Sequence, residues 1–338
     1  MSDTNVYYDE DADPSALDDR TVAMIGYGNQ GRSQALNLRD SGVEVVVGNR
    51  ADDYRERAHE DGFDAVSIEE AAARGDVICL LIPDEIAPAL FDAEIEPGLA
   101  EDDTLYLSHG YNLTYDLLGQ PDTVDVVMVA PRMGGWAVRT LYESGQGFPS
   151  VMAVEQDYTG EAKRTALAMA KAIGSTRAGV VEGTAEMETI TDLLSEQALF
   201  PIWANAMLAK YQVEVAHGIP PEIVMTELYL SGEMAEIFEA MAAEGYLGQL
   251  PFHSTTSQYG QLSRMDAFDE TPLVEWFEDQ LAHINDGGFA REWSAEQSLD
   301  RPGLKRLYDK YEQSDFFEAE QRTMDRLNIG AGADAEDE

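Results

Sequence analysis

Short apolar segments alternate with amphipathic segments through the first half of the chain. Five segments are rich in β-branched and other apolar residues and have the length of buried strands: 21–28, 43–50, 76–84, 104–110 and 124–131. The segments between them show the apolar spacing of helices, at 29–42, 54–62 and 86–95. Strands that alternate with helices predict βαβ units and a parallel sheet. We therefore expect an α/β domain of the doubly wound Rossmann type over residues 1–183.

The pattern becomes almost entirely helical in the second half of the chain. Residues 187–218 form one long apolar-periodic segment that ends at a glycine. Residues 220–245 begin with two prolines and end at Gly245, which predicts a second helix over this range. We expect an all-α domain over residues 184–328 and a solvated acidic tail over residues 329–338.

Composition favours a soluble globular protein. Of the 338 residues 44% are apolar, yet no apolar run approaches the roughly 18 residues that span a bilayer. The acidic N-terminal segment lacks the apolar stretch of a secretory signal. The single cysteine, Cys79, lies in a predicted strand, which is typical of an inert core residue. We expect a cytoplasmic protein without a membrane partner.

The acidic charge excludes several classes of partner. Asp and Glu number 65 against 22 Lys and Arg, which gives a formal net charge of −43. The acids occur in every segment, so they do not form the local patch that a cationic partner would need. Such a surface repels nucleic acid and anionic lipid, and it repels itself unless salt screens it. We interpret the charge as an adaptation to a salt-rich cytoplasm, where the Debye length falls to about 3 Å at 1 M salt.

A glycine motif follows the first predicted strand and opens the first predicted helix. In a Rossmann fold the first glycine permits a tight turn, the second lets a pyrophosphate approach the backbone, and the third lets helix and strand pack closely. The helix N-terminus then faces the phosphates with its positive end. We therefore predict a dinucleotide site at Gly26, Tyr27, Gly28, Asn29, Gln30 and Gly31.

The end of the second predicted strand bears on the choice between NADH and NADPH. Asp52 lies where an acid bonds the ribose 2′-hydroxyl, and Asp53 follows it. Arg50 favours the opposite choice, since an arginine there can hold a 2′-phosphate. Two carboxylates beside a phosphate dianion are unfavourable, so we predict NADH over NADPH. A solvated acidic loop explains both aspartates about equally well.

Seven motifs, the glycine motif among them, extend the pattern across the chain. They are IGYGNQG (25–31), LNLRDSGVEVVVG (36–48), LIPDE (81–85), SHGYN (108–112), TDLLSEQ (191–197), QYG (258–260) and FAREW (289–293). In order and spacing the sequence resembles the ketol-acid reductoisomerase family over nearly its whole length. The resemblance implies conversion of 2-acetolactate or 2-aceto-2-hydroxybutyrate to a dihydroxy acid. It further implies two Mg²⁺ ions, a nicotinamide cofactor, and a knotted helical domain that intertwines in a homodimer or higher homo-oligomer.

The resemblance assigns roles to individual residues. Asp192 and Glu196 are four residues apart, on one face of a predicted helix, and match metal ligands. Glu227 matches a ligand that the partner subunit contributes and that also contacts substrate, and Ser254 matches a substrate-binding serine. Carboxylates suit Mg²⁺, a hard cation that prefers oxygen ligands. The remaining expected site residues, at the nicotinamide and the reacting centre, are Pro83, Asp84, His109 and Arg132.

Several positions depart from the family pattern. Ser231 stands where the family has a second glutamate, which makes a second Mg²⁺ doubtful, and Glu233 is rotated about 200° from it on a continuous helix. Arg132 replaces a lysine and Trp136 a histidine, and PIWANA (201–206) replaces a cysteine-glycine segment. Two alternatives therefore stay open: a paralogous oxidoreductase or oxidoisomerase for another hydroxy or keto acid, such as a sugar acid, and a non-catalytic dinucleotide sensor.

Overall fold

The computed structural model describes residues 4–329, and the chain divides into two compact units, Met1–Asp192 and Leu193–Glu338. The first unit includes the first two turns of α8 (Ala185–Leu194), beyond the predicted boundary at residue 183. Residues 330–338 of the predicted tail lie outside the described part. Within that part, no helix combines the length and the apolar character needed to cross a membrane.

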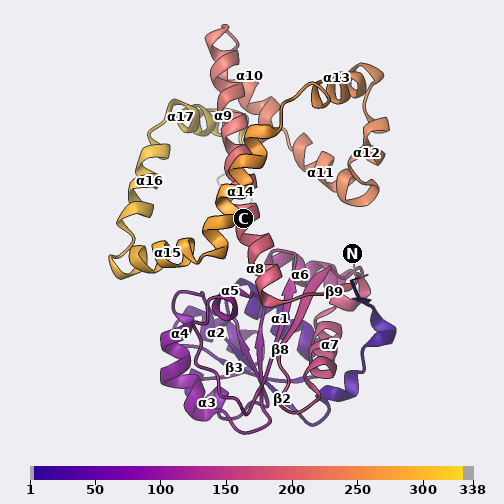
Figure 1. Cartoon of the computed structure of the whole chain (residues 1–338), viewed down its shortest axis with the longest axis vertical. Helices are drawn as coiled ribbons and strands as arrows, with labels where there is room; N and C mark the ends of the chain where they lie inside the picture. Colours follow the sequence, from indigo (N-terminus) through magenta and orange to yellow (C-terminus); the bar gives the residue numbers. More distant parts are fainter. Residues whose placement is uncertain (1–3, 330–338) are drawn as a thin grey trace. The chain divides into compact units, whose positions relative to one another are not determined.

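The first unit is built on a sheet of nine strands within residues 4–329 (Figure 1). Its spatial order is β1-β9-β8-β7-β6-β5-β2-β3-β4. All neighbours pair in parallel except β7 with β8 and β1 with β9. The strands are β1 (Val6–Tyr7), β2 (Thr21–Ile25), β3 (Glu44–Gly48), β4 (Asp64–Val66), β5 (Val77–Leu80), β6 (Thr104–Leu107), β7 (Asp125–Pro131), β8 (Ser150–Gln156) and β9 (Val180–Glu182). The predicted parallel sheet is confirmed for its central strands β2 to β7, whereas the pairs β7–β8 and β1–β9 are antiparallel.

Helices cover both faces of this sheet because successive strand residues point to opposite sides. On β2, Val22 and Met24 pack into one cluster of buried residues, whereas Ala23 and Ile25 pack into the other. Cys79 is fully buried in the first cluster, and burial raises the pKa of its thiol. The helices before α8 are α1 (Asn29–Asp40), α2 (Asp53–Glu60), α3 (Ile68–Ala72), α4 (Ala87–Leu90), α5 (Tyr111–Thr114), α6 (Gly135–Glu143) and α7 (Ala162–Ile173).

The carboxyl ends of the central strands reach one edge of the sheet together. Ile25 of β2 pairs with Gly48 of β3 on one side and with Leu80 of β5 on the other. Leu80 in turn pairs with Leu107 of β6. The chain order reverses between β2 and β5, and ligands of doubly wound sheets bind outside the strand ends at such a switch point. The motifs that follow these strands therefore converge.

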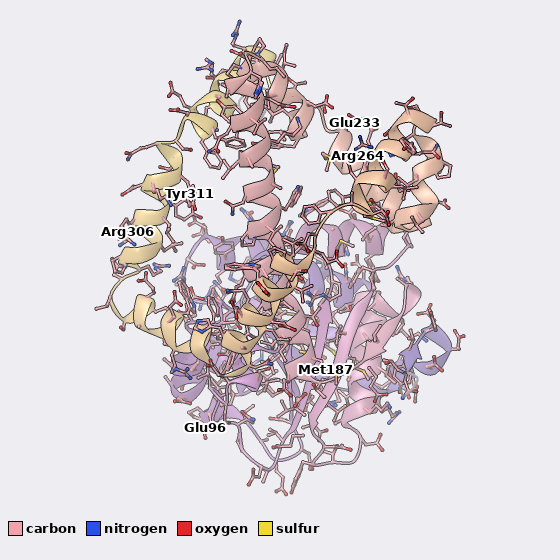
Figure 2. The ribbon with its side chains drawn as sticks, turned by 45° about the horizontal axis from the view of Figure 1, so that its top comes forward. Glu96, Met187, Glu233, Arg264, Arg306 and Tyr311 are labelled. Carbon is pink, nitrogen blue, oxygen red and sulfur yellow. The ribbon has the colours of Figure 1, made fainter. Side chains whose placement is uncertain are left out.

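The second unit is entirely helical in its described residues. A small cluster of buried side chains from α9, α10 and α17 includes Tyr211, Met225 and Phe316. Figure 2 labels Arg306 and Tyr311 on α16, which lies on the chain just before α17. The helices are α9 (Phe200–Ala216), α10 (Pro221–Met225), α11 (Glu233–Glu244), α12 (Tyr246–Gln249), α13 (Thr255–Met265), α14 (Thr271–Asn285), α15 (Gly288–Ser298), α16 (Pro302–Glu312) and α17 (Asp315–Leu327).

The predicted segment 187–218 forms a continuous helical run from α8 to α9, interrupted by one wide π turn at Ser195–Leu199. The cause lies in Pro201, which has no N–H to donate and whose ring clashes with the carbonyl four residues earlier. The wider turn accommodates the proline without ending the helix. Single π turns of this kind occur frequently at functional sites.

The single helix predicted over 220–245 is wrong. The chain forms α10 and a π turn at Thr226–Leu230, and then breaks at Gly232, whose φ of +84° lies in the left-handed region. A new helix, α11, begins at Glu233, whose backbone N–H donates to the Ser231 Oγ at 3.3 Å. Glycine adopts this conformation without the strain that a Cβ would cause, so it stops one helix and lets the next start. The 200° rotation expected for Glu233 on a continuous helix therefore does not apply.

Candidate active site

The glycine turn has the geometry expected of a dinucleotide loop. Gly26 has a φ of +95°, and a Cβ on it would lie 2.4 Å from the Leu81 carbonyl oxygen. A Cβ on Gly31 would lie 2.1 Å from the Gly26 carbonyl oxygen, so α1 packs directly against the turn. Gly28 faces open space, with no atom within 4 Å of a Cβ placed on it. The turn thus has two glycines that the fold requires and one that leaves room for a ligand.

This contrast yields a prediction that separates folding from binding. Gly31→Ala places a methyl group against backbone, so we expect a loss of about 1–3 kcal/mol in unfolding free energy together with loss of NADH binding. Gly28→Ala meets no protein atom, so its melting temperature should match that of the unsubstituted protein while its NADH affinity falls about tenfold or more. Thermal unfolding and NADH fluorescence titration measure both quantities. A Gly28→Ala protein with unchanged NADH affinity would contradict the assignment of this turn to the pyrophosphate.

Two of the predicted cofactor residues also have structural roles. The Tyr27 side chain is buried, and its hydroxyl donates to Asp61 Oδ2 at 2.9 Å. Asp52 is the N-cap of α2, where it accepts from the Tyr54 N–H, and it pairs with the exposed Arg50 at 2.5 Å. The hydrogen bond from Arg50 is the largest influence on the Asp52 pKa and holds it below the usual range. The contacts that Tyr27, Arg50, Asp52 and Asp53 are predicted to make with a cofactor stay predictions.

A pocket of about 200 Å³ opens at the carboxyl ends of β5 and β6. Gln30 lines it from the glycine turn, and its side-chain N–H donates to the Met133 carbonyl at 2.9 Å. The residues that line the pocket are far apart in the sequence, and the sheet brings them together because β2, β5 and β6 end in register. Four predicted site residues line this pocket: Gln30, Pro83, Asp84 and His109.

His109 lies beside a buried glutamate at the end of β6. Its Nδ1 is 3.0 Å from Glu188 Oε2, which also accepts the Gly110 backbone N–H at 2.8 Å. The start of α8 approaches Gly110 so closely that a Cβ there would lie 2.4 Å from the Ala185 carbonyl oxygen. Burial disfavours a charged imidazole, but the hydrogen bond and charge of Glu188 prevail and raise the pKa of His109 to about 9. The imidazole is therefore positively charged at neutral pH.

Arg132 joins this group from the residue that follows β7. Its Nη1 donates to Glu188 Oε1 at 2.5 Å, and its Nη2 donates to Asp192 Oδ1. One ligand atom each from His109, Glu188 and Asp192 lies within 4.8 Å of the others, which makes them a possible cation site among the described residues. Carboxylate oxygens are the donors that hard cations such as Mg²⁺ prefer, so Glu188 and Asp192 suit a divalent ion, whereas His109 could join them only as neutral imidazole.

Glu188 is the site residue that the sequence motifs did not single out. It is 3% exposed, and both cationic side chains of the group bind its carboxylate. Burial opposes its charge, but the hydrogen bond and charge of His109, the Gly110 N–H and Arg132 together lower its pKa. Figure 2 labels its neighbour Met187 on α8. Its signal in the sequence was the spacing: acids at 188, 192 and 196 repeat every four residues and share one helix face.

Asp84 completes the charged surroundings of the pocket. Its Oδ2 lies 3.9 Å from His109 Nε2, and its Oδ1 accepts from the Asn112 amide at 3.1 Å. Burial raises the pKa of Asp84 to about 6, while His109 acts to lower it and Glu85 to raise it further. Two acids and one imidazole with displaced pKa values therefore meet at one strand edge, as in many catalytic sites.

The other predicted residues belong to the second unit. Glu196 is exposed within the π turn after α8, and Glu227 is exposed within the π turn after α10. Glu227 lines a hollow of about 560 Å³ together with Arg326 of α17. Ser254 is the N-cap of α13, where its Oγ accepts the Ser257 N–H at 3.2 Å. These carboxylates stay predicted ligands.

Comparison with known families decides the classification of the chain. Residues 16–179 match the family model described as acetohydroxy acid isomeroreductase, NADPH-binding domain, and residues 186–328 match the ketol-acid reductoisomerase C-terminal domain. The chain belongs to the ketol-acid reductoisomerase family. This is a family of NAD(P)-dependent oxidoreductases, and the resemblance inferred from the motifs is confirmed.

Individual members of the family agree over nearly the full length. The chain is 42% identical to the ketol-acid reductoisomerase (NADP(+)) of Haloarcula marismortui, over 99% of this chain and 98% of that one. It is 43% identical to the enzyme of the same name from Methanopyrus kandleri, over 91% and 93%. A solved NADH-preferring ketol-acid reductoisomerase from an uncultured archaeon superposes with a TM-score of 0.89, at 35% identity, covering 97% of this chain and 99% of that chain. The two-domain family fold is therefore confirmed.

Proposed function

We propose that the protein is a Mg²⁺-dependent ketol-acid reductoisomerase of branched-chain amino-acid biosynthesis. It moves an alkyl group within a 2-hydroxy-3-keto acid such as 2-acetolactate and reduces the rearranged ketone with NADH or NADPH. The observation that carries this proposal is the group of His109, Arg132, Glu188 and Asp192 at the strand edge next to the glycine turn. An acid substrate and a reduced cofactor would meet there beside a set of carboxylates.

Asp192 and Glu196 would hold Mg²⁺, with Glu227 of a second subunit. Bound Mg²⁺ supplies Lewis-acid polarisation of the substrate oxygens. The chain's own residues then serve distinct roles. His109 carries its proton at neutral pH and sits beside the pocket, so it can stabilise or protonate an oxygen that gains charge. Glu188 fixes the direction of both His109 and Arg132 through hydrogen bonds. Ser254 would contact the substrate.

We propose NADH as the preferred cofactor. Asp52 and Asp53 lie at the start of α2, in the segment that follows β3, where a 2′-phosphate would meet two carboxylates. Arg50 is already paired with Asp52 at 2.5 Å, and the guanidinium of Arg55, the next cation along the chain, donates to the Asn49 carbonyl at 2.7 Å. The similar solved structure is of an NADH-preferring enzyme, while the curated relatives bear the name of NADP(+) enzymes. Rates with the two cofactors at equal concentration test this choice.

A homodimer, or a larger homo-oligomer built from it, is part of the proposal. The described part of the second unit leaves many large apolar side chains exposed, and exposed apolar surface can mark a contact between subunits. A second copy of the same unit would cover them, and the knotted path of the helical domain stays a prediction. Light scattering in molar KCl measures the assembly. Examples of the exposed side chains are Ile223, Leu247, Phe252, Tyr259, Phe268 and Tyr308.

A hydride-transfer assay in molar KCl tests the function directly. We expect 2-acetolactate to oxidise the reduced cofactor with Mg²⁺ and not with a chelator. Asp192→Asn should lower kcat/KM about 1000-fold, since loss of several kcal/mol of metal-dependent stabilisation has that size. Asp64→Asn removes a carboxylate that pairs with Arg74 on the surface, so it serves as the matched control with unchanged rate. Equal rates with Mg²⁺ and with chelator would contradict the proposal.

A second candidate function rests on the departures from the family pattern. Arg132 ion-pairs where the family has a lysine, Trp136 is 70% exposed at the start of α6, and Ser231 precedes a helix break. These changes favour a paralogue that acts on another hydroxy or keto acid. Inert acetolactate with intact Mg²⁺ and cofactor binding would support that paralogue. Cofactor binding without any Mg²⁺ dependence or hydride transfer would instead support the sensor.

A further inference from the structure

The side chain of Arg132 bridges two acids of different surroundings. Its backbone is fixed, because its N–H donates to the Pro149 carbonyl at 2.9 Å across the β7–β8 pair. One guanidinium nitrogen donates to buried Glu188 at 2.5 Å, and the other donates to Oδ1 of the partly exposed Asp192. The planar guanidinium can make both bonds at once, which a compact ammonium cannot do in the same way.

The Glu188 side of this bridge is held firmly. Besides Arg132, its carboxylate accepts from His109 and from the Gly110 backbone, and it is nearly out of contact with solvent. Glu188 therefore has little freedom to move away from Arg132. The guanidinium is thus anchored at one end, and its second nitrogen is aimed at Asp192.

We infer that Arg132 competes with a divalent cation for Asp192 and lowers the affinity of the site. The inference rests on the proposed function, in which Asp192 is a metal ligand. Without a cation, the guanidinium engages Asp192 Oδ1 through a charge-assisted hydrogen bond. A cation bound at Asp192 faces a second positive charge at hydrogen-bond distance from the same carboxylate, so the Arg132 bond must be released. Only the fraction of protein in which this bond is open can bind the cation, so the apparent Kd is the intrinsic Kd divided by that open fraction.

A charge-conserving variant isolates this effect. Arg132→Lys keeps the positive charge near the site but removes the fork that binds both acids. We expect its Kd for Mn²⁺, measured from the electron paramagnetic resonance of free Mn²⁺ in the titrated dimer, to fall about tenfold. Arg164→Lys makes the same change at a surface arginine that pairs with Asp13 and Glu161, and should leave the Kd unchanged. Equal Kd values for Arg132→Lys and the unsubstituted protein would overturn the inference.

Two further measurements keep the outcomes separate. If Asp192→Asn binds Mn²⁺ as tightly as the unsubstituted protein, Asp192 is not a ligand and the proposed function fails with the inference. If Asp192→Asn weakens binding but Arg132→Lys does not tighten it, only the inference fails. Should Arg132→Lys not fold, the arginine ¹⁵N signals of the unsubstituted protein give the answer. Slow rotation of the Arg132 guanidinium without Mg²⁺ and faster rotation with Mg²⁺ would support competition. Rotation that Mg²⁺ leaves unchanged would overturn it.

Discussion

Glu188→Gln should lower kcat/KM by about 100-fold and move the titration of His109 from alkaline to acidic pH. The side chain keeps its size but loses the negative charge that holds two cationic groups in place. Residues that orient ligands and catalytic groups in this way typically contribute a factor of 10–100 in activity. The buried carboxylate accepts from His109, Gly110 and Arg132 at once, so its loss affects the whole group.

The direction of the pH effect follows from the pKa of His109. Burial lowers that pKa, but the hydrogen bond and charge of Glu188, with smaller contributions from Asp84 and Asp192, raise it to about 9, so a glutamine removes the two largest influences that oppose burial and the pKa should fall. A raised folded-state pKa stabilises the fold fully below pH 6.5, and this stabilisation is lost as the pH rises through about 9. The unfolding free energy of the unsubstituted protein should therefore decrease as the pH rises from 6.5 to about 9. The Glu188→Gln variant should lack this His109-dependent decrease.

Imidazole proton shifts measure the titration, since the chain has only five histidines. Glu182→Gln is the matched control, because Glu182 is a hydrogen-bonded glutamate of the same unit that accepts from Tyr7 and Lys163. It should leave the pKa of His109 and the rate unchanged. If Glu188→Gln keeps both the alkaline titration and full activity, Glu188 does not position this site.

Stability should depend steeply on salt. Even if each of the 22 basic residues neutralised one of the 65 acids, 43 acids would have no opposite charge. Their mutual repulsion extends over a Debye length of about 10 Å at 0.1 M salt and about 3 Å at 1 M. We expect the melting temperature to rise by roughly 10–20 °C between these concentrations of KCl, equivalent to about 5 kcal/mol for units of this size.

Thermal unfolding across a KCl series measures this dependence. Sucrose at matched osmolality is the control, because it is excluded from the protein surface without screening charge. It should give a much smaller rise than KCl. A melting temperature that does not change with KCl would remove the interpretation of the acidic surface as an adaptation to salt.

The sequence by itself determined the fold class, the glycine turn and the family. Apolar spacing is a local property, so it identified the central strands and helices such as α1, α2 and α9 directly from neighbouring residues. The glycine turn could be predicted from the sequence because only glycine fits the close backbone contacts at Gly26 and Gly31. The helical spacing of Asp192 and Glu196 predicts one face for both, and their role as metal ligands stays a prediction.

Only the tertiary structure decided the surroundings of the site. The strand register brought His109, Arg132 and α8 together from distant segments and buried Glu188 among them, and no local pattern encodes that burial. The break at Gly232 depends on a left-handed backbone angle, whereas the apolar spacing across it reads as one helix. Likewise, Arg132 was recognisable as a retained positive charge, but its bond to Asp192 depends on where β7 ends relative to α8. Charges act through space, and the chain fixes their distances only when it folds.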